Sequence, residues 1–274
     1  MKIQNAGDLT VPAHHKLMIV GQAGSGKSKL LTTLPGKTFA WVFDPSAESA
    51  YKGCEHVDYS SYNIDLMDLT PYSLAKATNE KIKPIGKVAP PKAYLDYAND
   101  FNDAWSQGLY DSYENIAMDS FTTFQDVSMD AVMFNNQRFG KVPQQDDYPA
   151  AMALAMRNMR SMCSLNKNIY IIFHDVMEQD DATKKMLYVP LIIGKNKARI
   201  PNLFNHLLRC TAEQERSSVT KKLETRYKIQ TTPDRYVPGI RTAFQGLDPI
   251  HDVTIEDFSK PQEYGLGKII SEQK

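Results

Sequence analysis

The chain has 274 residues, of which 42% are hydrophobic and 23% are charged, and its 32 basic residues balance its 32 acidic ones. This composition is typical of a globular protein and excludes a disordered chain, a collagen-like repeat and a coiled coil. No apolar run approaches the roughly 18 residues that a membrane span needs, and three scattered cysteines without C-x-x-C spacing favour a reducing, cytoplasmic location over a zinc site or a disulfide framework.

The predicted elements in the first part of the chain alternate between strands and a helix. Residues 16–20 form an apolar run that ends at a glycine, which is typical of a buried parallel strand. A glycine-rich turn and a helix that ends before Pro35 follow, and residues 38–43 predict a second strand. We expect residues 52–92 to form an insertion or a long loop, because prolines crowd their second half.

Helical spacing returns after residue 92. Tyr94, Ala98, Phe101 and Trp105 are separated by four, three and four positions, which predicts one buried helix face. The same criteria predict, in chain order, a strand over 115–118, a helix over 121–134, an exposed loop over 135–143, a helix over 152–163 and strands over 169–173, 206–211 and 225–231.

Strands separated by helices predict an α/β fold with a mainly parallel central sheet, and the closer spacing of the later strands predicts antiparallel additions near the C-terminus. We expect a single domain over residues 1–250 and a C-terminal tail over residues 251–274.

The turn after the first strand carries the most specific signal in the sequence. It matches G-x-x-x-x-G-K-[ST] at Gly21, Gln22, Ala23, Gly24, Ser25, Gly26, Lys27 and Ser28. Glycines let the backbone wrap a phosphate with its N–H groups pointing inward, and the positive end of the following helix faces the same anion. Lys27 can place its charge between the β- and γ-phosphates, and the Ser28 hydroxyl can ligate Mg²⁺. The sequence therefore predicts a nucleotide site.

Hydrolysis at such a site needs further polar groups at the ends of neighbouring strands. Asp119 ends the 115–118 strand and is the expected second magnesium ligand; the alternative is a helix-capping aspartate. Asp44 and Glu48 follow the second strand, and we prefer Glu48 as the group that activates water, because a glutamate has the longer reach; either acid can also be a surface residue. His174 ends the 169–173 strand, where it can sense the γ-phosphate or bond a backbone carbonyl.

These motifs together resemble the core of RecA-type P-loop proteins. The resemblance rests on GQAGSGKS, TFAWVFDPSAE, NIAMDS and IYIIFHD, covers most of residues 16–211 and extends to LIIGKNKARIPNLFNHLLRC. More narrowly, the chain is similar to phage-encoded core-only RecA-like proteins that bind and anneal single-stranded DNA. The resemblance implies a three-layer RecA-like P-loop NTPase fold, with ATP and Mg²⁺ bound by the loop and Asp119.

The resemblance also implies single-stranded DNA and further copies of the chain as partners. DNA would be held by loops that correspond to residues 135–141 and 175–199, and subunits would form a ring or a short filament. Because almost nothing precedes the first strand, we expect no separate N-terminal assembly domain and only weak filament formation.

The charge distribution offers separate support for a polyanionic partner. Residues 96–147 hold ten acids and two bases, whereas residues 184–241 hold thirteen bases and four acids, although the two segments can also neutralise each other. In one candidate DNA contact, positive charge is combined with an aromatic ring at Arg138, Phe139 and Lys141. The other candidates are the basic residues in or beside the loop after the 169–173 strand, namely Lys184, Lys185, Lys195, Lys197 and Arg199. The last three can instead reach the γ-phosphate of a neighbouring subunit or remain solvated.

The leading hypothesis is an ATP-dependent single-stranded DNA-binding protein that acts in phage-type recombination or replication in the host cytoplasm. Two alternatives use the same loop. One is an assembly scaffold in which ATP sets the oligomeric state with little turnover, and the other is a small-molecule kinase. The kinase would need an arginine-rich lid, for which Arg157 and Arg160 are too few.

Overall fold

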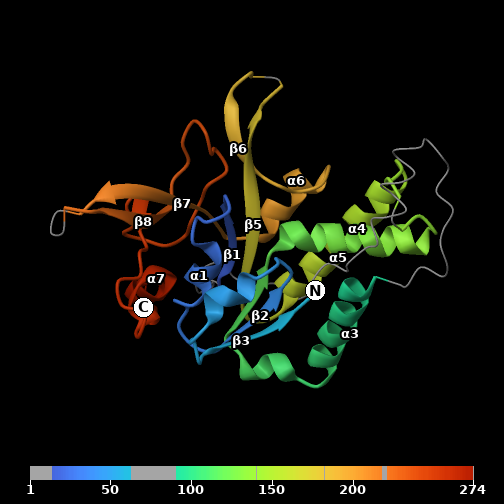
Figure 1. Ribbon diagram of the computed structural model, residues 1–274, viewed down its shortest axis with the longest axis horizontal. Helices are drawn as coiled ribbons and strands as arrows, with labels where there is room; N and C mark the ends of the chain where they lie inside the picture. The colour runs from blue at the N-terminus through green and yellow to red at the C-terminus, as the bar shows by residue number, and fades with distance from the viewer. Residues whose placement is uncertain (1–13, 63–90, 140, 182, 218–220, 274) are drawn as a thin grey trace, which may run out of the picture.

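The computed structural model describes residues 14–62, 91–139, 141–181, 183–217 and 221–273 (Figure 1). Its strands pair in the order β3-β2-β4-β5-β1-β7-β8-β9, and β6 pairs with β5 outside this path. The strands are β1 (Lys16–Gly21), β2 (Thr38–Val42), β3 (Val57–Ser61), β4 (Asn115–Asp119), β5 (Asn168–Gln179), β6 (Met186–Pro190), β7 (His206–Arg216), β8 (Leu223–Gln230) and β9 (Ile250–Asp252).

The strands from β3 to β7 in this order are parallel, and β6, β8 and β9 pair antiparallel with their neighbours. The helices are α1 (Lys27–Leu31), α3 (Lys92–Ser106), α4 (Phe121–Asn135), α5 (Asp147–Ser164), α6 (Asn196–Arg199) and α7 (Gly265–Glu272), with short 3₁₀ turns η2 (Ala47–Tyr51), η3 (Leu109–Ser112), η4 (Ile200–Leu203) and η5 (Pro261–Glu263).

Alternating side chains of the central strands build two cores, one on each face of the sheet. In β1, Met18 and Val20 pack in the core formed with α3, α4 and α5, whereas Leu17 and Ile19 pack in the core formed with α1 and α7. Figure 1 shows the two groups of helices on opposite sides of the strands. The predicted three-layer α/β fold is confirmed. In the described part of the chain, no helix is long and apolar enough to cross a membrane.

The expected loop over residues 52–92 is corrected in its first part. Val57–Ser61 is β3, which pairs in parallel with β2 at the edge of the sheet. Only Val57 of its five residues is buried, so this edge strand lacks the apolar run by which the buried strands were identified. Residues 63–90 lie outside the described residues.

The helix predicted after residue 92 is confirmed as α3, but the face that it buries differs from the expected one. Ala93, Tyr97, Phe101 and Ala104 are buried, whereas Trp105 is 55% exposed. Tyr97 packs edge-on against the ring of Trp41, which lies in β2. The aromatic side chains of β2 therefore determine which face of α3 is buried. The residue spacing within α3 was not sufficient to predict that face.

Two hairpins extend beyond the carboxyl edge of the parallel strands. β5 runs past its pairing with β1 and pairs from Asp175 to Gln179 with β6, and β7 continues to Arg216 alongside β8. In Figure 1 they project in different directions, one upward and one to the left. The loop that the resemblance implied over residues 175–199 is therefore a hairpin followed by the short helix α6.

Part of the segment expected to form a C-terminal tail packs against the phosphate-loop helix. Leu266 and Ile269 of α7 are fully buried in the core that contains Leu30 and Leu31 of α1. The backbone N–H of Leu266 donates to Thr33 Oγ1 at 3.0 Å. Residues 265–272 are therefore part of the support for α1.

Shortening a side chain of α7 tests that support. Ile269→Ala leaves a cavity in the core around α1, and we expect it to lower the free energy of unfolding by about 2–5 kcal/mol, measured by urea denaturation. Ile250→Ala is the matched control, because Ile250 is 50% exposed, and we expect a change within about 0.5 kcal/mol. Equal losses of the free energy of unfolding in Ile269→Ala and Ile250→Ala would contradict the assignment of α7 to the core.

Candidate nucleotide site

The predicted phosphate loop connects β1 to α1 in the structure. Gly24 and Gly26 have φ values of +78° and +84°, in the left-handed region where a Cβ atom is strained. A Cβ on Gly26 would lie 2.7 Å from the Tyr227 ring, whereas one on Gly24 would meet nothing within 4 Å. The Tyr227 ring therefore contacts the loop at Gly26, and the space beside Gly24 is open.

Lys27 lies beneath the loop with only 5% of its surface exposed. Its Nζ donates to the carbonyl of Gln22, 2.7 Å away, and burial lowers its pKa. Ser25 Oγ is also buried and has no hydrogen-bond partner in the described part of the chain. The buried amine of Lys27 and the buried hydroxyl of Ser25 can both donate hydrogen bonds to an anion bound in this turn.

Asp119 is the last residue of β4 and lies at the same edge of the sheet as the loop. It is fully buried, and Tyr51 donates its hydroxyl to Oδ2 at 2.6 Å, whereas Oδ1 accepts no hydrogen bond from the described residues. Burial raises the pKa of Asp119, and the interactions of its carboxylate with Tyr51 and Ser28 act in the opposite direction. Ser120, not Asp119, caps α4, with Oγ 3.3 Å from the N–H of Thr123.

The donor set at Asp119 fits a magnesium ion. A carboxylate oxygen without a partner and the Ser28 hydroxyl beside the same carboxylate are hard oxygen ligands, which Mg²⁺ prefers. A buried, unpaired carboxylate is costly, and a bound cation offsets that cost. The geometry thus brings together the two residues that the sequence predicted as metal ligands.

Asp44 and His174 meet at the same edge of the sheet, on either side of β4. His174 Nε2 lies 2.7 Å from Asp44 Oδ2, while Ser120 and Thr123 donate to Oδ1. Burial acts to raise the pKa of Asp44, but the bonds from His174, Thr123 and Ser120 outweigh it and lower the pKa. The His174 ring thus bonds a carboxylate at the phosphate edge, and both oxygens of Asp44 are occupied.

Glu48 lies on η2, three residues before Tyr51. Its Oε2 atom is buried and has no hydrogen-bond partner among the described residues. Tyr51 was missed in the sequence because nothing distinguishes it from the other 13 of the chain's 14 tyrosines. Its contact with Asp119 joins segments 68 positions apart and is visible only in the folded chain.

In the loop after α4, the residues expected to contact DNA interact instead with neighbouring residues of the chain. The guanidinium of Arg138 bonds Asp147 and also lies 3.0 Å from Asp146 Oδ1. Phe139 packs edge-on against Phe134, and Lys141 donates to the carbonyl of Gln137 at 3.4 Å. The charge of Arg138 is therefore neutralised by neighbours within ten residues.

The other expected DNA contacts lie on or beside the β5–β6 hairpin. Lys184 and Lys185 are exposed at its turn, where Lys184 Nζ is 4.0 Å from Asp181. Lys195, which precedes α6, and Arg199, its last residue, are exposed, and Lys197 of α6 pairs with Glu178 of β5 at 2.9 Å. The hairpin and α6 thus present one group of basic residues.

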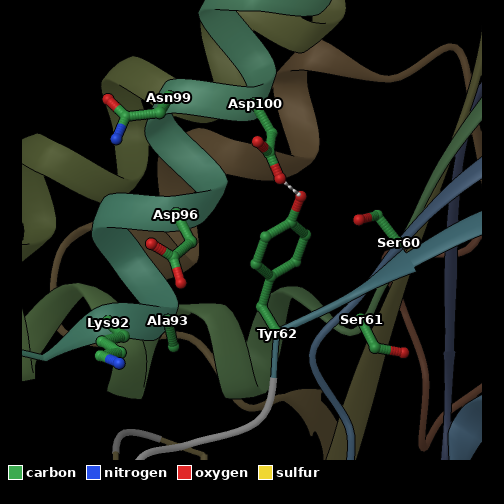
Figure 2. A pocket seen from close by; sticks show the side chains of 8 residues that line it. All are labelled: Ser60, Ser61, Tyr62, Lys92, Ala93, Asp96, Asn99 and Asp100. Carbon is green, nitrogen blue, oxygen red and sulfur yellow. Dashed lines mark hydrogen bonds between the residues drawn. The ribbon is translucent and has the colours of Figure 1, made fainter.

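A separate hollow of about 510 Å³ lies between the end of β3 and α3, and no residue of the phosphate loop lines it. Tyr62 donates its hydroxyl to Asp100 at 2.5 Å. Figure 2 shows this contact and Asp96 on the same side of α3. The described lining of this hollow is mainly polar and includes the carboxylates of Asp96 and Asp100.

The buried charge of Asp119 predicts a pH dependence of stability. Because its pKa is raised in the folded state, the native protein binds this proton more tightly than the unfolded chain does. The free energy of unfolding therefore falls as pH rises above about 4, the ordinary carboxyl range, until Asp119 is ionised. We expect the stability of Asp119→Asn relative to the wild type to grow over that range, measured by urea denaturation between pH 4 and 8 without nucleotide.

Asp103→Asn is the control, because Asp103 is exposed on α3. A stability difference between Asp119→Asn and the wild type that does not change with pH would contradict the assignment.

Curated proteins with similar sequences belong to the Ras-like group. The chain is 38% identical over 56 residues to the human Ras-related and estrogen-regulated growth inhibitor, covering 20% of this chain and 28% of that protein. It is 24% identical over 215 residues to Ras-like protein family member 12 of Danio rerio, covering 73% of this chain and 78% of that protein. The chain thus spans little more than a quarter of the length of the growth inhibitor that it matches.

A family model gives the broader match. The model described as an AAA domain matches residues 13–241, which include the phosphate loop, Asp119 and His174. The loop between β1 and α1 and the parallel strands that hold its polar partners agree with that match. The chain belongs to the AAA-domain family of P-loop NTPases.

Proposed function

We propose that this P-loop NTPase hydrolyses ATP with Mg²⁺ at the loop Gly21–Ser28. The observation that carries the proposal is the pair of unmet buried groups beside Lys27, the Oδ1 atom of Asp119 and the hydroxyl of Ser25. Ser28 and Asp119 would hold the ion, which when bound draws negative charge from the phosphate oxygens. Lys27 donates to the Gln22 carbonyl in this structure, and its charged amine can donate instead to an oxygen of a bound phosphate.

Glu48 is the proposed group that activates water. Its Oε2 has no partner in the described part of the chain, whereas both oxygens of Asp44 are engaged by His174, Ser120 and Thr123. A general base needs a free oxygen that can accept a proton from water. Asp44 instead fixes the ring of His174, which leaves the second ring nitrogen of His174 as a sensor of the terminal phosphate.

Turnover measurements separate this proposal from a scaffold and from a kinase. We expect the wild type to release phosphate from ATP only with Mg²⁺, and Lys27→Ala to bind ATP about ten- to a hundredfold more weakly, because it loses a charged hydrogen bond. Glu48→Gln should retain ATP binding and lose at least about a hundredfold in kcat. Steady-state phosphate release and calorimetric titration provide the two readouts.

The control is Glu55→Gln, an exposed glutamate beyond η2 that should leave both readouts unchanged. ATP binding without phosphate release would favour the scaffold, and transfer of phosphate to a nucleoside would favour the kinase. Normal turnover in Glu48→Gln would contradict the role of Glu48.

The finer proposal is a RecA-type function, in which ATP binding promotes binding and annealing of single-stranded DNA in phage-type recombination or replication. Its support is the resemblance of the phosphate-loop motif and the three strand motifs, together with exposed Lys184 and Lys185 at the hairpin turn and exposed Lys195 and Arg199 at α6. His174, at the γ-phosphate edge, and Asp175, where the hairpin begins, are adjacent in β5. The nucleotide site and the DNA site would thus share the strand β5. Assembly of further copies of the chain would lengthen the surface that binds DNA.

The hairpin turn provides the test of DNA binding. We expect the double variant Lys184→Ala and Lys185→Ala to bind an oligothymidine several-fold more weakly with ATP, and its slope of log K against log salt to fall by about 1.4, since each phosphate contact contributes about 0.7. Fluorescence anisotropy at several salt concentrations measures both. The matched control replaces two exposed lysines outside the hairpin, Lys92 and Lys268. An unchanged slope in the hairpin variant would contradict this contact, and no ATP-dependent DNA binding by the wild type would contradict the RecA-type function.

A further inference from the structure

An apolar hollow of about 210 Å³ adjoins the phosphate loop on the side away from Asp119. It is lined by residues of the loop and α1 and of the later strands and segments, among them Ser25, Gly26, Tyr227, Val253, Ile255 and Phe258. Pockets for whole drug-sized ligands span about 300–1,000 Å³, so this volume suits one part of a ligand whose remainder lies outside.

The strand order places this hollow at the nucleoside end of a bound nucleotide. β4, with Asp119, lies on one side of β1, and β7 and β8, with Tyr227, lie on the other. The terminal phosphates and magnesium belong beside Asp119 and Ser28 if the proposed function holds, and the present inference depends on that. The nucleoside at the opposite end of the phosphate chain then extends toward β8.

Aromatic rings at the hollow have faces suited to stacking. The Tyr227 ring lies directly against Gly26, where a Cβ atom would approach within 2.7 Å, so the loop glycine also admits this ring. Phe258 is 64% exposed despite its size, and Lys29 Nζ lies 5.1 Å from its centroid. An exposed aromatic ring beside an anion-binding loop gains from covering by a flat, apolar ligand surface.

Among the described residues that line the hollow, the side chains with polar groups are Ser25, Lys29, Cys210 and Tyr227. Hydroxyls of Ser25 and Tyr227 can donate or accept, and Lys29 Nζ already donates to the carbonyl of Ala50 at 2.9 Å. Adenine and guanine share the same fused rings and differ in the donors and acceptors at their edges. Apolar walls therefore recognise the ring area that both share, and discrimination would require fixed donors or acceptors in the pocket.

We propose that this hollow binds the base of a purine nucleoside triphosphate, stacked against Tyr227 and Phe258, and that it accepts adenine and guanine nearly equally. Both ATP and GTP are then ligands of the site, and the ring stacking, not the base edge, sets the affinity gained from the nucleoside.

Calorimetric titration of the full chain with Mg²⁺ and four ligands tests the proposal. ATP and GTP should bind within about threefold of each other, and each about tenfold or more tightly than UTP and inorganic tripolyphosphate, because a single stacked base contributes affinity of that order. Phe258→Ala should weaken ATP and GTP binding about tenfold and leave tripolyphosphate binding unchanged. Tyr227 also contacts the loop at Gly26, so Tyr227→Leu should weaken ATP and GTP binding about tenfold more than it weakens tripolyphosphate binding.

Trp105→Ala is the matched control, since Trp105 is an aromatic residue of similar exposure on α3, outside the hollow. ATP that binds no more tightly than tripolyphosphate, or variants at Tyr227 and Phe258 that bind like the control, would overturn the base site and leave the phosphate-loop function intact. A difference above tenfold between ATP and GTP would overturn the equal acceptance of purines. Tripolyphosphate and ATP that both fail to bind would overturn the proposed function itself.

Discussion

The buried carboxylate of Asp119 is the constraint that organises the nucleotide site. It is fully excluded from solvent, one of its oxygens is bonded by Tyr51, and the other has no partner among the described residues. Such an arrangement raises the pKa and costs stability unless a cation is bound. Parallel strands bring their carboxyl ends to one edge, which places Asp44, Asp119 and His174 together there.

A buried ion pair connects the bases of the two projecting hairpins across β1. Arg209 of β7 lies 2.6 Å from Asp175 of β5, and its guanidinium covers the ring of Tyr188 in β6 at 3.6 Å. β1 lies between β5 and β7 and leads directly into the phosphate loop. The loop is thus flanked by two hairpins whose positions depend on the same contact, and breaking one partner of a buried pair is strongly destabilising.

The C-terminal part of the chain completes the other side of the site. α7 supports α1 from the core, and Tyr227 with the segment around Phe258 borders the loop at Gly26. Residues about 200 to 240 positions after the loop therefore pack beside the loop and its helix. From the sequence we expected a tail over residues 251–274, whereas residues 265–272 form α7 and place Leu266 and Ile269 in the core beside α1.

The phosphate loop, the buried strands and Asp119 could be predicted from local sequence, because glycine spacing and continuous apolar runs directly reflect backbone conformation and burial. β3 could not, since an edge strand with one buried residue has no such run. Tyr51, the buried face of α3 and the wall formed by Tyr227 were decided only by tertiary structure. Each depends on a contact between segments distant in the chain, and local spacing carries no information about which distant side chain will fill a given position.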